Sequence, residues 1–121
     1  MTYSINQKDE LTEKIRQTIA KKIPEANESD RAEVSLCTLS FQSSIYPQRH
    51  VWIDTDDGIK IDLEDWQDES EWDNAVARIT VESIEELVDL VRTWLGGENL
   101  EQYSNVNKEY KIVKKIAAIS T

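Results

Sequence analysis

Residues 51–63, VWIDTDDGIKIDL, contain two short apolar runs separated by the polar sequence TDDG. This arrangement is typical of a β-hairpin. A two-residue turn would place Ile53 on the same face as Asp62, whereas a three-residue loop with Gly58 in the left-handed conformation pairs Ile53 with Ile61. We predict the three-residue loop, because it collects the apolar side chains on one face. The opposite face then carries Trp52, Asp54, Lys60 and Asp62.

The hairpin is followed by a predicted strand and an amphipathic helix. Residues 75–81 alternate between apolar and polar side chains, which predicts a strand. Ser83 and Glu86 form a capping box, in which each side chain satisfies a free amide of the first turn. The helix behind it has one apolar stripe and ends at Gly96 and Gly97. The stripe contains Ile84, Leu87, Val88, Val91, Trp94 and Leu95. We expect Trp94 to pack in the core.

Near the start of the chain, an apolar residue at every fourth position predicts a further helix. These positions are Leu11, Ile15, Ile19 and Ile23. Asn6 or Ser4 is expected to cap the start of the helix, because a short side-chain oxygen accepts from a free first-turn amide. Pro24 ends the helix, since proline disfavours the helical conformation of the residue before it.

Between this helix and the hairpin, we expect a polar connector over residues 24–31, a strand and a loop over residues 42–49. The strand, residues 33–41, has an alternation that slips near Leu36 and Cys37. The slip indicates either a bulge or a strand that is covered on both faces. Cys37 is expected to be a small buried hydrophobic residue.

The C-terminal segment is predicted to form a helix over residues 107–119, with a strand through residues 110–113 as the alternative. The whole chain, residues 1–121, is then one α+β domain. Because short connections join its strands, we expect a four-stranded antiparallel meander with N-terminal and C-terminal helices packed on one face.

Acidic residues are concentrated in one part of the chain. The 121 residues carry 24 Asp and Glu against 14 Lys and Arg, a formal net charge of -10. Residues 54–73 alone contain ten acids and one lysine, so nearly all of the net charge lies there. An acidic surface repels nucleic acid and anionic membranes, which argues against both as partners.

Composition excludes several other classes of protein. A single cysteine excludes an intramolecular disulfide and a Cys-based zinc cluster, and a single histidine excludes catalytic pairs of imidazoles. We expect His50 to lie on the surface or at a strand edge. No apolar stretch approaches the roughly 20 residues of a membrane span, and residues 1–10 lack the apolar core of a signal peptide. The sequence therefore predicts a soluble, cytoplasmic protein.

The acidic stretch has two interpretations. Its carboxylates form a solvated loop while its tryptophans pack in the core, or the two together form a docking surface for a cationic protein. In a docking surface, the charges steer the encounter and the aromatic side chains supply the buried area. The candidate residues are Asp65, Asp68, Glu69, Glu71 and Asp73 for electrostatics, with Trp66 and Trp72 as anchors.

Metal-binding and catalytic interpretations have less support. An EF-hand counted from Asp54 fails, because Gly58 falls at the fifth position instead of the sixth. A simpler calcium or magnesium site at the hairpin tip is the remaining metal alternative. Asp62 and Glu64 alternate onto one side of a strand, as paired acid–base carboxylates would. Because no substrate-binding signature accompanies them, we predict a non-enzyme without a cofactor.

The strand-and-helix run AVARITVESIEELVDLVRTWLGG, residues 75–97, follows an acidic segment that contains tryptophan. This pattern, over roughly residues 51–97, resembles the small acidic immunity proteins of bacterial toxin systems. Those proteins are compact α+β domains that bind and neutralise a toxin, often a basic nuclease. The resemblance implies a non-enzymatic inhibitor whose carboxylates occupy a cationic surface of its partner.

The leading hypothesis is therefore an acidic protein-binding module with a basic protein partner. A second hypothesis is a self-associating domain, in which Trp52 and the second sheet face form a homodimer interface. A small metal-dependent or hydrolytic enzyme is the third.

Overall fold

The structure, a computed structural model, describes residues 8–33, 35–66, 75–98 and 110–112. Within these residues the chain forms two α-helices, one short 3-10 helix and six strands. In chain order they are α1 (Glu10–Lys22), β1 (Ala26–Glu28), η1 (Asp30–Ala32), β2 (Thr38–Ser43), β3 (Arg49–Asp54), β4 (Ile59–Asp65), β5 (Ala75–Val81), α2 (Ile84–Leu95) and β6 (Tyr110–Ile112).

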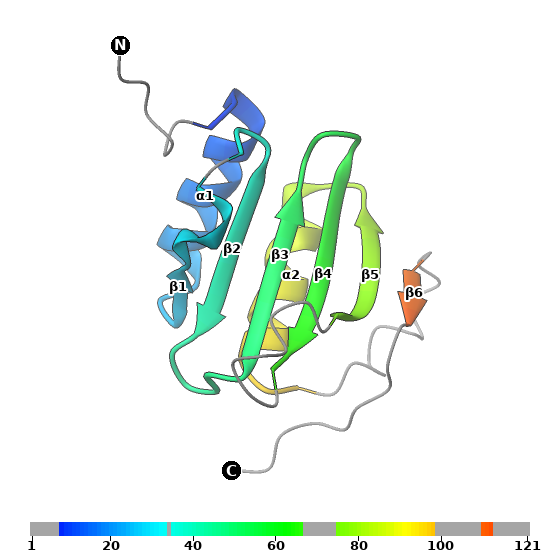
Figure 1. Cartoon of the computed structure of the whole chain (residues 1–121). Helices are drawn as coiled ribbons and strands as arrows, with labels where there is room; N and C mark the ends of the chain where they lie inside the picture. Colours follow the sequence, from blue (N-terminus) through cyan, green and yellow to red (C-terminus); the bar gives the residue numbers. More distant parts are fainter. Residues whose placement is uncertain (1–7, 34, 67–74, 99–109, 113–121) are drawn as a thin grey trace.

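All of these strands belong to one sheet in the order β1-β2-β3-β4-β5-β6, and every neighbouring pair is antiparallel. Both α1 and α2 lie behind the same face of this meander (Figure 1). The predicted α+β class and the antiparallel meander with helices on one face are therefore confirmed. In the described part of the chain, neither helix is long and apolar enough to cross a membrane.

The sheet is wider than the four predicted strands. β1 lies in the predicted connector, where its three residues pair with β2. A polar strand of three residues is too short to show a hydrophobic alternation in the sequence, so only its backbone pairing with β2 identifies β1 as a strand. β6 replaces the predicted helix at residues 110–112, because the backbone there pairs with β5. The alternative strand is thus confirmed at these positions, and the rest of 107–119 lies outside the described residues.

The β3–β4 hairpin has the predicted register. Ile53 pairs with Ile61 and Asp54 pairs with Lys60. Gly58 has a φ of 78°, the left-handed conformation that the three-residue loop requires. Because side chains alternate along a strand, this register directs one apolar set toward the helices. Trp52, with His50 and Asp54 two residues to either side and their partners on β4, then points to the other face.

The core lies between the sheet and the two helices. Across β2 to β5, two rows of paired apolar side chains face the helices, and all are at most 3% exposed. The rows are Leu39, Ile53, Ile61 and Ile79, and Phe41, Val51, Leu63 and Ala77. α2 contributes most of its predicted stripe, and Trp94 is 1% exposed, so its predicted place in the core is confirmed.

The first turn of α1 differs from the prediction. Asp9, instead of Ser4 or Asn6, caps the helix, and its carboxylate accepts from the Thr12 amide at 2.8 Å. Leu11 is 39% exposed, while Thr12 is buried with its hydroxyl oxygen 2.6 Å from that of Thr55. A polar contact with the β3–β4 loop therefore takes the place that the four-residue period assigned to an apolar side chain.

The start of β2 explains the slip in alternation. The strand begins at Thr38, so Leu36 lies before it and is 55% exposed. Ser40 is fully buried on the outer face, because η1 crosses it and the Arg31 side chain donates to its hydroxyl at 2.7 Å. The slip therefore reflects where the strand begins and needs neither a bulge nor coverage on both faces, although β2 itself is covered on both faces at Ser40. Cys37 is only half-buried, and its thiol donates to Asp9, which corrects the expected buried cysteine.

α2 begins and ends where the sequence predicts. The Ser83 hydroxyl accepts from the Glu86 amide at 3.1 Å, and the Glu86 carboxylate accepts from the Glu82 amide at 2.9 Å. The helix ends at Leu95, before the two glycines, and Gly97 has a φ of 83°. This positive φ directs the chain away from the helix axis.

The two left-handed glycines give a matched test of backbone and packing constraints. A Cβ at position 58 meets nothing within 4 Å, whereas one at position 97 lies 2.7 Å from a ring carbon of Tyr46. Gly58→Ala is expected to lower the free energy of unfolding by about 1–2 kcal/mol, the cost of a left-handed residue with a Cβ. Gly97→Ala is expected to lower it by more, because the Tyr46 ring must also move. Urea unfolding of both variants measures the difference, and equal losses would contradict the close packing of Tyr46.

Candidate functional site

The candidate site lies on the face of the sheet that the helices leave uncovered (Figure 1). The strand register aligns outward-facing residues in rows across β2 to β5. One row contains Ser40, Trp52, Asp62 and Arg78. The next row contains Gln42, His50 and Glu64. Polar, charged and aromatic side chains are therefore concentrated on this face, as expected for the side of a sheet opposite its core.

Arg31 reaches from η1 onto this face and is held by aromatic and polar groups. Its guanidinium carbon lies 4.8 Å from the centroid of the Trp52 ring and 5.0 Å from that of Trp66. One guanidinium nitrogen donates to a carboxylate oxygen of Glu64, and another donates to the Ser40 hydroxyl. We name Ser40, Trp52, Glu64 and Trp66 the guanidinium cage. Both indoles are partly exposed, so the cage borders solvent.

The carboxylate of the cage is itself almost inaccessible. The Glu64 side chain is 4% exposed, and it accepts from the indole N–H of Trp66 at 3.1 Å as well as from Arg31. Burial raises the pKa of the Glu64 carboxyl, because the charged form loses its hydration, while the Arg31 charge and hydrogen bond act in the opposite direction. Glu64 therefore depends on a cation in the cage for its charged form.

His50 packs against one wall of the cage, the Trp66 ring. Its ring stacks on that of Trp66 with the centroids 3.8 Å apart and an interplanar angle of 17°. The Trp66 ring covers His50, which is only 5% exposed, and β3 lies between β2 and β4, so the expected surface or strand-edge position is wrong. Burial lowers the pKa of His50, since the imidazolium form would lose hydration.

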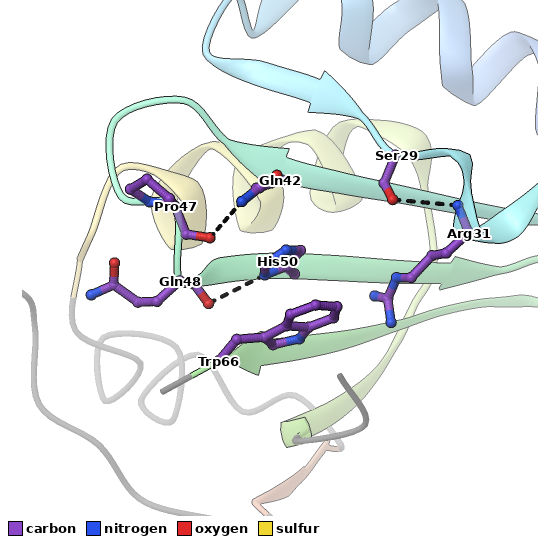
Figure 2. A pocket seen from close by; sticks show the side chains of 7 residues that line it. All are labelled: Ser29, Arg31, Gln42, Pro47, Gln48, His50 and Trp66. Carbon is purple, nitrogen blue, oxygen red and sulfur yellow. Dashed lines mark hydrogen bonds between the residues drawn. The ribbon is translucent and has the colours of Figure 1, made fainter. Parts of the chain in front are cut away.

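A hollow of about 520 Å³ opens beside the cage (Figure 2). Its lining combines an aromatic wall with amide and hydroxyl groups. The lining residues are Ser29, Arg31, Gln42, Pro47, Gln48, His50 and Trp66. The Gln42 side-chain amide donates to the Pro47 carbonyl at 2.8 Å, which holds the rim of the hollow against the β2–β3 loop. The volume suits a side chain or a small molecule.

Asp65, a predicted surface residue, is buried on the opposite face. Its side chain is 6% exposed and lies 3.4 Å from the Nε of Arg49, which is fully buried. The Arg49 guanidinium lies 3.6 Å from the centroid of the Trp94 ring and donates to the Trp94 and Glu98 carbonyls. Asp65 therefore balances a buried charge at the C-terminus of α2, and it does not contribute to the outer surface.

The other predicted site residues divide into two groups. Trp66 lies in the cage beside Trp52, whereas Asp68, Glu69, Glu71, Trp72 and Asp73 lie outside the described residues. Sequence reasoning missed Arg31, His50 and Glu64 as members of the site. The hairpin register could have placed Glu64 on the face of Trp52, but Arg31 lies in a polar connector with no signal of its own.

The carboxylates of the catalytic and metal alternatives have other partners. Asp62 lies 3.4 Å from Arg78, and Glu64 pairs with Arg31. At the hairpin tip, Asp54 accepts from the Asp56 amide at 2.8 Å. Among the residues that the structure describes, no group of three or more His, Cys, Asp or Glu side chains is arranged to hold a metal ion.

Comparison with known proteins gives no assignment. No protein-family model matches the chain, and neither a characterised protein nor a solved structure shows significant similarity to it. The resemblance to immunity proteins therefore stays a prediction, and the geometry of the open face carries the functional argument.

Two aspartates of β4 provide a test of which carboxylates hold the fold. Asp65→Asn is expected to lower the free energy of unfolding by about 3–5 kcal/mol, because it leaves the buried Arg49 without its counter-charge. Asp62→Asn is expected to cost less, about 1 kcal/mol, because its partner Arg78 is half exposed and water partly screens the pair. Denaturant unfolding of both variants at neutral pH checks the ranking, and a small cost for Asp65→Asn would show that Asp65 is dispensable.

Because His50 is buried as a neutral imidazole, we expect the free energy of unfolding to fall in weak acid. The pKa of His50 is lower in the folded than in the unfolded chain, so the neutral imidazole stabilises the fold. This contribution to the free energy of unfolding is complete above the ordinary pKa of 6.5, and it is lost as the pH falls through the lowered pKa of the folded chain. Glu64, whose pKa is raised, acts with the opposite sign. The comparison is therefore between the wild type and His50→Phe, which keeps a ring against Trp66. The slope of unfolding free energy between about pH 5 and 7 should be flatter in the variant, and identical slopes would contradict the assignment.

Proposed function

We propose that the chain is a non-enzymatic protein-binding module that docks a basic partner protein on the open face of its sheet. The observation that carries the proposal is the pair of partly exposed indoles, Trp52 and Trp66, held against the same guanidinium on a face that neither described helix covers. Exposed, fixed aromatic side chains beside charged groups are the usual anchors of protein interfaces.

The sign of the partner follows from charge. Residues 54–73, which include β4, contain ten acids and one lysine, and an acidic excess remains when Asp65, buried on the other face, and Glu64, paired with Arg31, are left out. Asp56 and Asp57 are exposed at the tip of the hairpin, and in the sequence four more acids, Asp68, Glu69, Glu71 and Asp73, follow Trp66. A field of this sign accelerates the encounter with a positively charged surface.

An immunity-type role is the form of this function that we favour. A module of this kind would cover a cationic surface of a toxin and block its activity without a chemical step. The uncovered aromatic face and the concentrated acidity support this role, since both are suited to binding a basic protein and neither supplies a reaction centre.

The proposal is tested with three forms of the protein. Asp68→Asn/Glu69→Gln/Glu71→Gln neutralises the acids after Trp66, and Glu10→Gln/Glu85→Gln/Asp89→Asn makes the same change of net charge on the exposed surfaces of α1 and α2. Tagged wild type and both variants are incubated with lysate of the source cell and washed at low and at high salt. We expect a basic protein on the wild type and the helix variant at low salt only, because exposed charges are screened over about 8 Å at physiological ionic strength.

The captured partner is then purified and its association rate measured. The variant after Trp66 is expected to associate on the order of tenfold more slowly than the helix variant. Equal association rates for the two variants would show that only the net charge of the protein affects the rate. That result would contradict a local acidic surface. If the lanes contain only this chain, and sedimentation shows a concentration-dependent dimer, the chain is a self-associating domain and the proposal is wrong.

A further inference from the structure

We infer that the guanidinium cage is the binding pocket for one arginine side chain of the partner, and that Arg31 occupies this pocket in the free protein. The inference rests on the proposed function and specifies its chemistry. Ser40, Trp52, Glu64 and Trp66 already surround a guanidinium with two aromatic rings, a carboxylate and a hydroxyl. Nothing in this set of contacts depends on the guanidinium belonging to the same chain.

The cage favours guanidinium over ammonium. A planar, weakly hydrated guanidinium makes favourable contacts with indole rings and has spread-out donors for several oxygens at once. Arg31 uses both properties, since it lies within about 5 Å of two ring centroids and donates in two directions, to Glu64 and to Ser40. A lysine side chain has a compact, strongly hydrated charge that uses this geometry less well.

The charge of the cage requires that the partner's arginine replaces Arg31 instead of binding beside it. Glu64 is 4% exposed, so water does not compensate its charge and a cation must. A second guanidinium placed beside Arg31 would meet a like charge in a poorly hydrated site. If the partner's arginine replaces Arg31, Glu64 remains paired throughout and no buried charge is left alone. The exchange therefore avoids the cost of an uncompensated buried charge.

The local structure provides a path for this exchange. Arg31 belongs to η1, a single turn of three residues, and its side chain is 19% exposed while that of Glu64 is 4% exposed. The hollow of about 520 Å³ is lined by Arg31 itself, by Trp66 of the cage and by His50, which stacks on Trp66 (Figure 2). A side chain that enters the hollow along the Trp66 ring reaches the cage as Arg31 moves outward.

Arg31 then acts as an internal competitor. The apparent affinity for an outside guanidinium is reduced in proportion to the fraction of molecules whose cage is open. Removing Arg31 should therefore strengthen the binding of an arginine side chain. If the face were only an acidic surface without this pocket, removing Arg31 would strengthen arginine binding no more than removing another arginine of the face.

The experiment uses N-acetylarginine amide and N-acetyllysine amide as probes. Each is titrated into wild type, Arg31→Ala and Arg78→Ala, and the indole N–H signals of Trp52 and Trp66 are followed by NMR. Arg78 is the matched control, because it is an exposed arginine of the same face with the same charge change. Arg31→Ala is expected to bind the arginine probe at least about tenfold more tightly than wild type or Arg78→Ala. It should also bind the arginine probe more tightly than the lysine probe, and adding Glu64→Gln should abolish the gain.

Arg31→Lys provides a second variant if Arg31→Ala does not fold, because a lysine keeps Glu64 paired while it competes less well for the cage. The inference is overturned if the folded variant binds the arginine probe no better than wild type, or binds both probes equally. If wild type still captures a basic protein in a salt-dependent way, that result leaves the proposed function intact. Conversely, arginine binding by Arg31→Ala without any captured partner would refute the proposed function and keep the cage as a guanidinium pocket.

Discussion

The arrangement of α2 on the sheet depends on the contacts of one buried group, the Arg49 guanidinium. Without water, its charge must be met by Asp65 and by the carbonyl end of α2, where the Trp94 and Glu98 carbonyls accept from it. The Trp94 indole in turn donates to the His50 and Glu64 carbonyls at 3.1 Å. These contacts fix the end of α2 against β3 and β4 at the residues whose side chains form the candidate site.

The register of β3 and β4 sets two buried carboxylates on opposite faces of the sheet. The consecutive residues Glu64 and Asp65 face outward and inward, so Asp65 meets Arg49 of β3 on the core side and Glu64 meets Arg31 of η1 in the outer cage. Because side chains alternate along a strand, a slip of one residue would move a buried carboxylate to the wrong face on each strand. The same register that builds the hydrophobic core therefore positions the site on the open face.

The acidic stretch is less available to a partner than its composition indicates. Within the described residues, three acids already have a structural contact: Asp62 with Arg78, Glu64 with Arg31 and Asp65 with Arg49. A count of charge therefore overstates the acidic surface of the hairpin. Among the described residues, the exposed hairpin tip and the aromatic cage remain for recognition.

The sequence by itself determined the elements whose signals are local. Alternation and the positive φ of Gly58 define the β3–β4 register, and Ser83 with Gly97 bounds α2, because turn and cap chemistry depends on a few adjacent residues. Only the tertiary structure decided that residues 26–28 and 110–112 are strands, since both are defined by pairing with a distant backbone. It also brought Arg31 to Glu64 across 33 positions of the chain and moved Asp65 from the expected surface into the core. Burial and ion pairing join residues that are far apart in the sequence, so no local pattern reveals them.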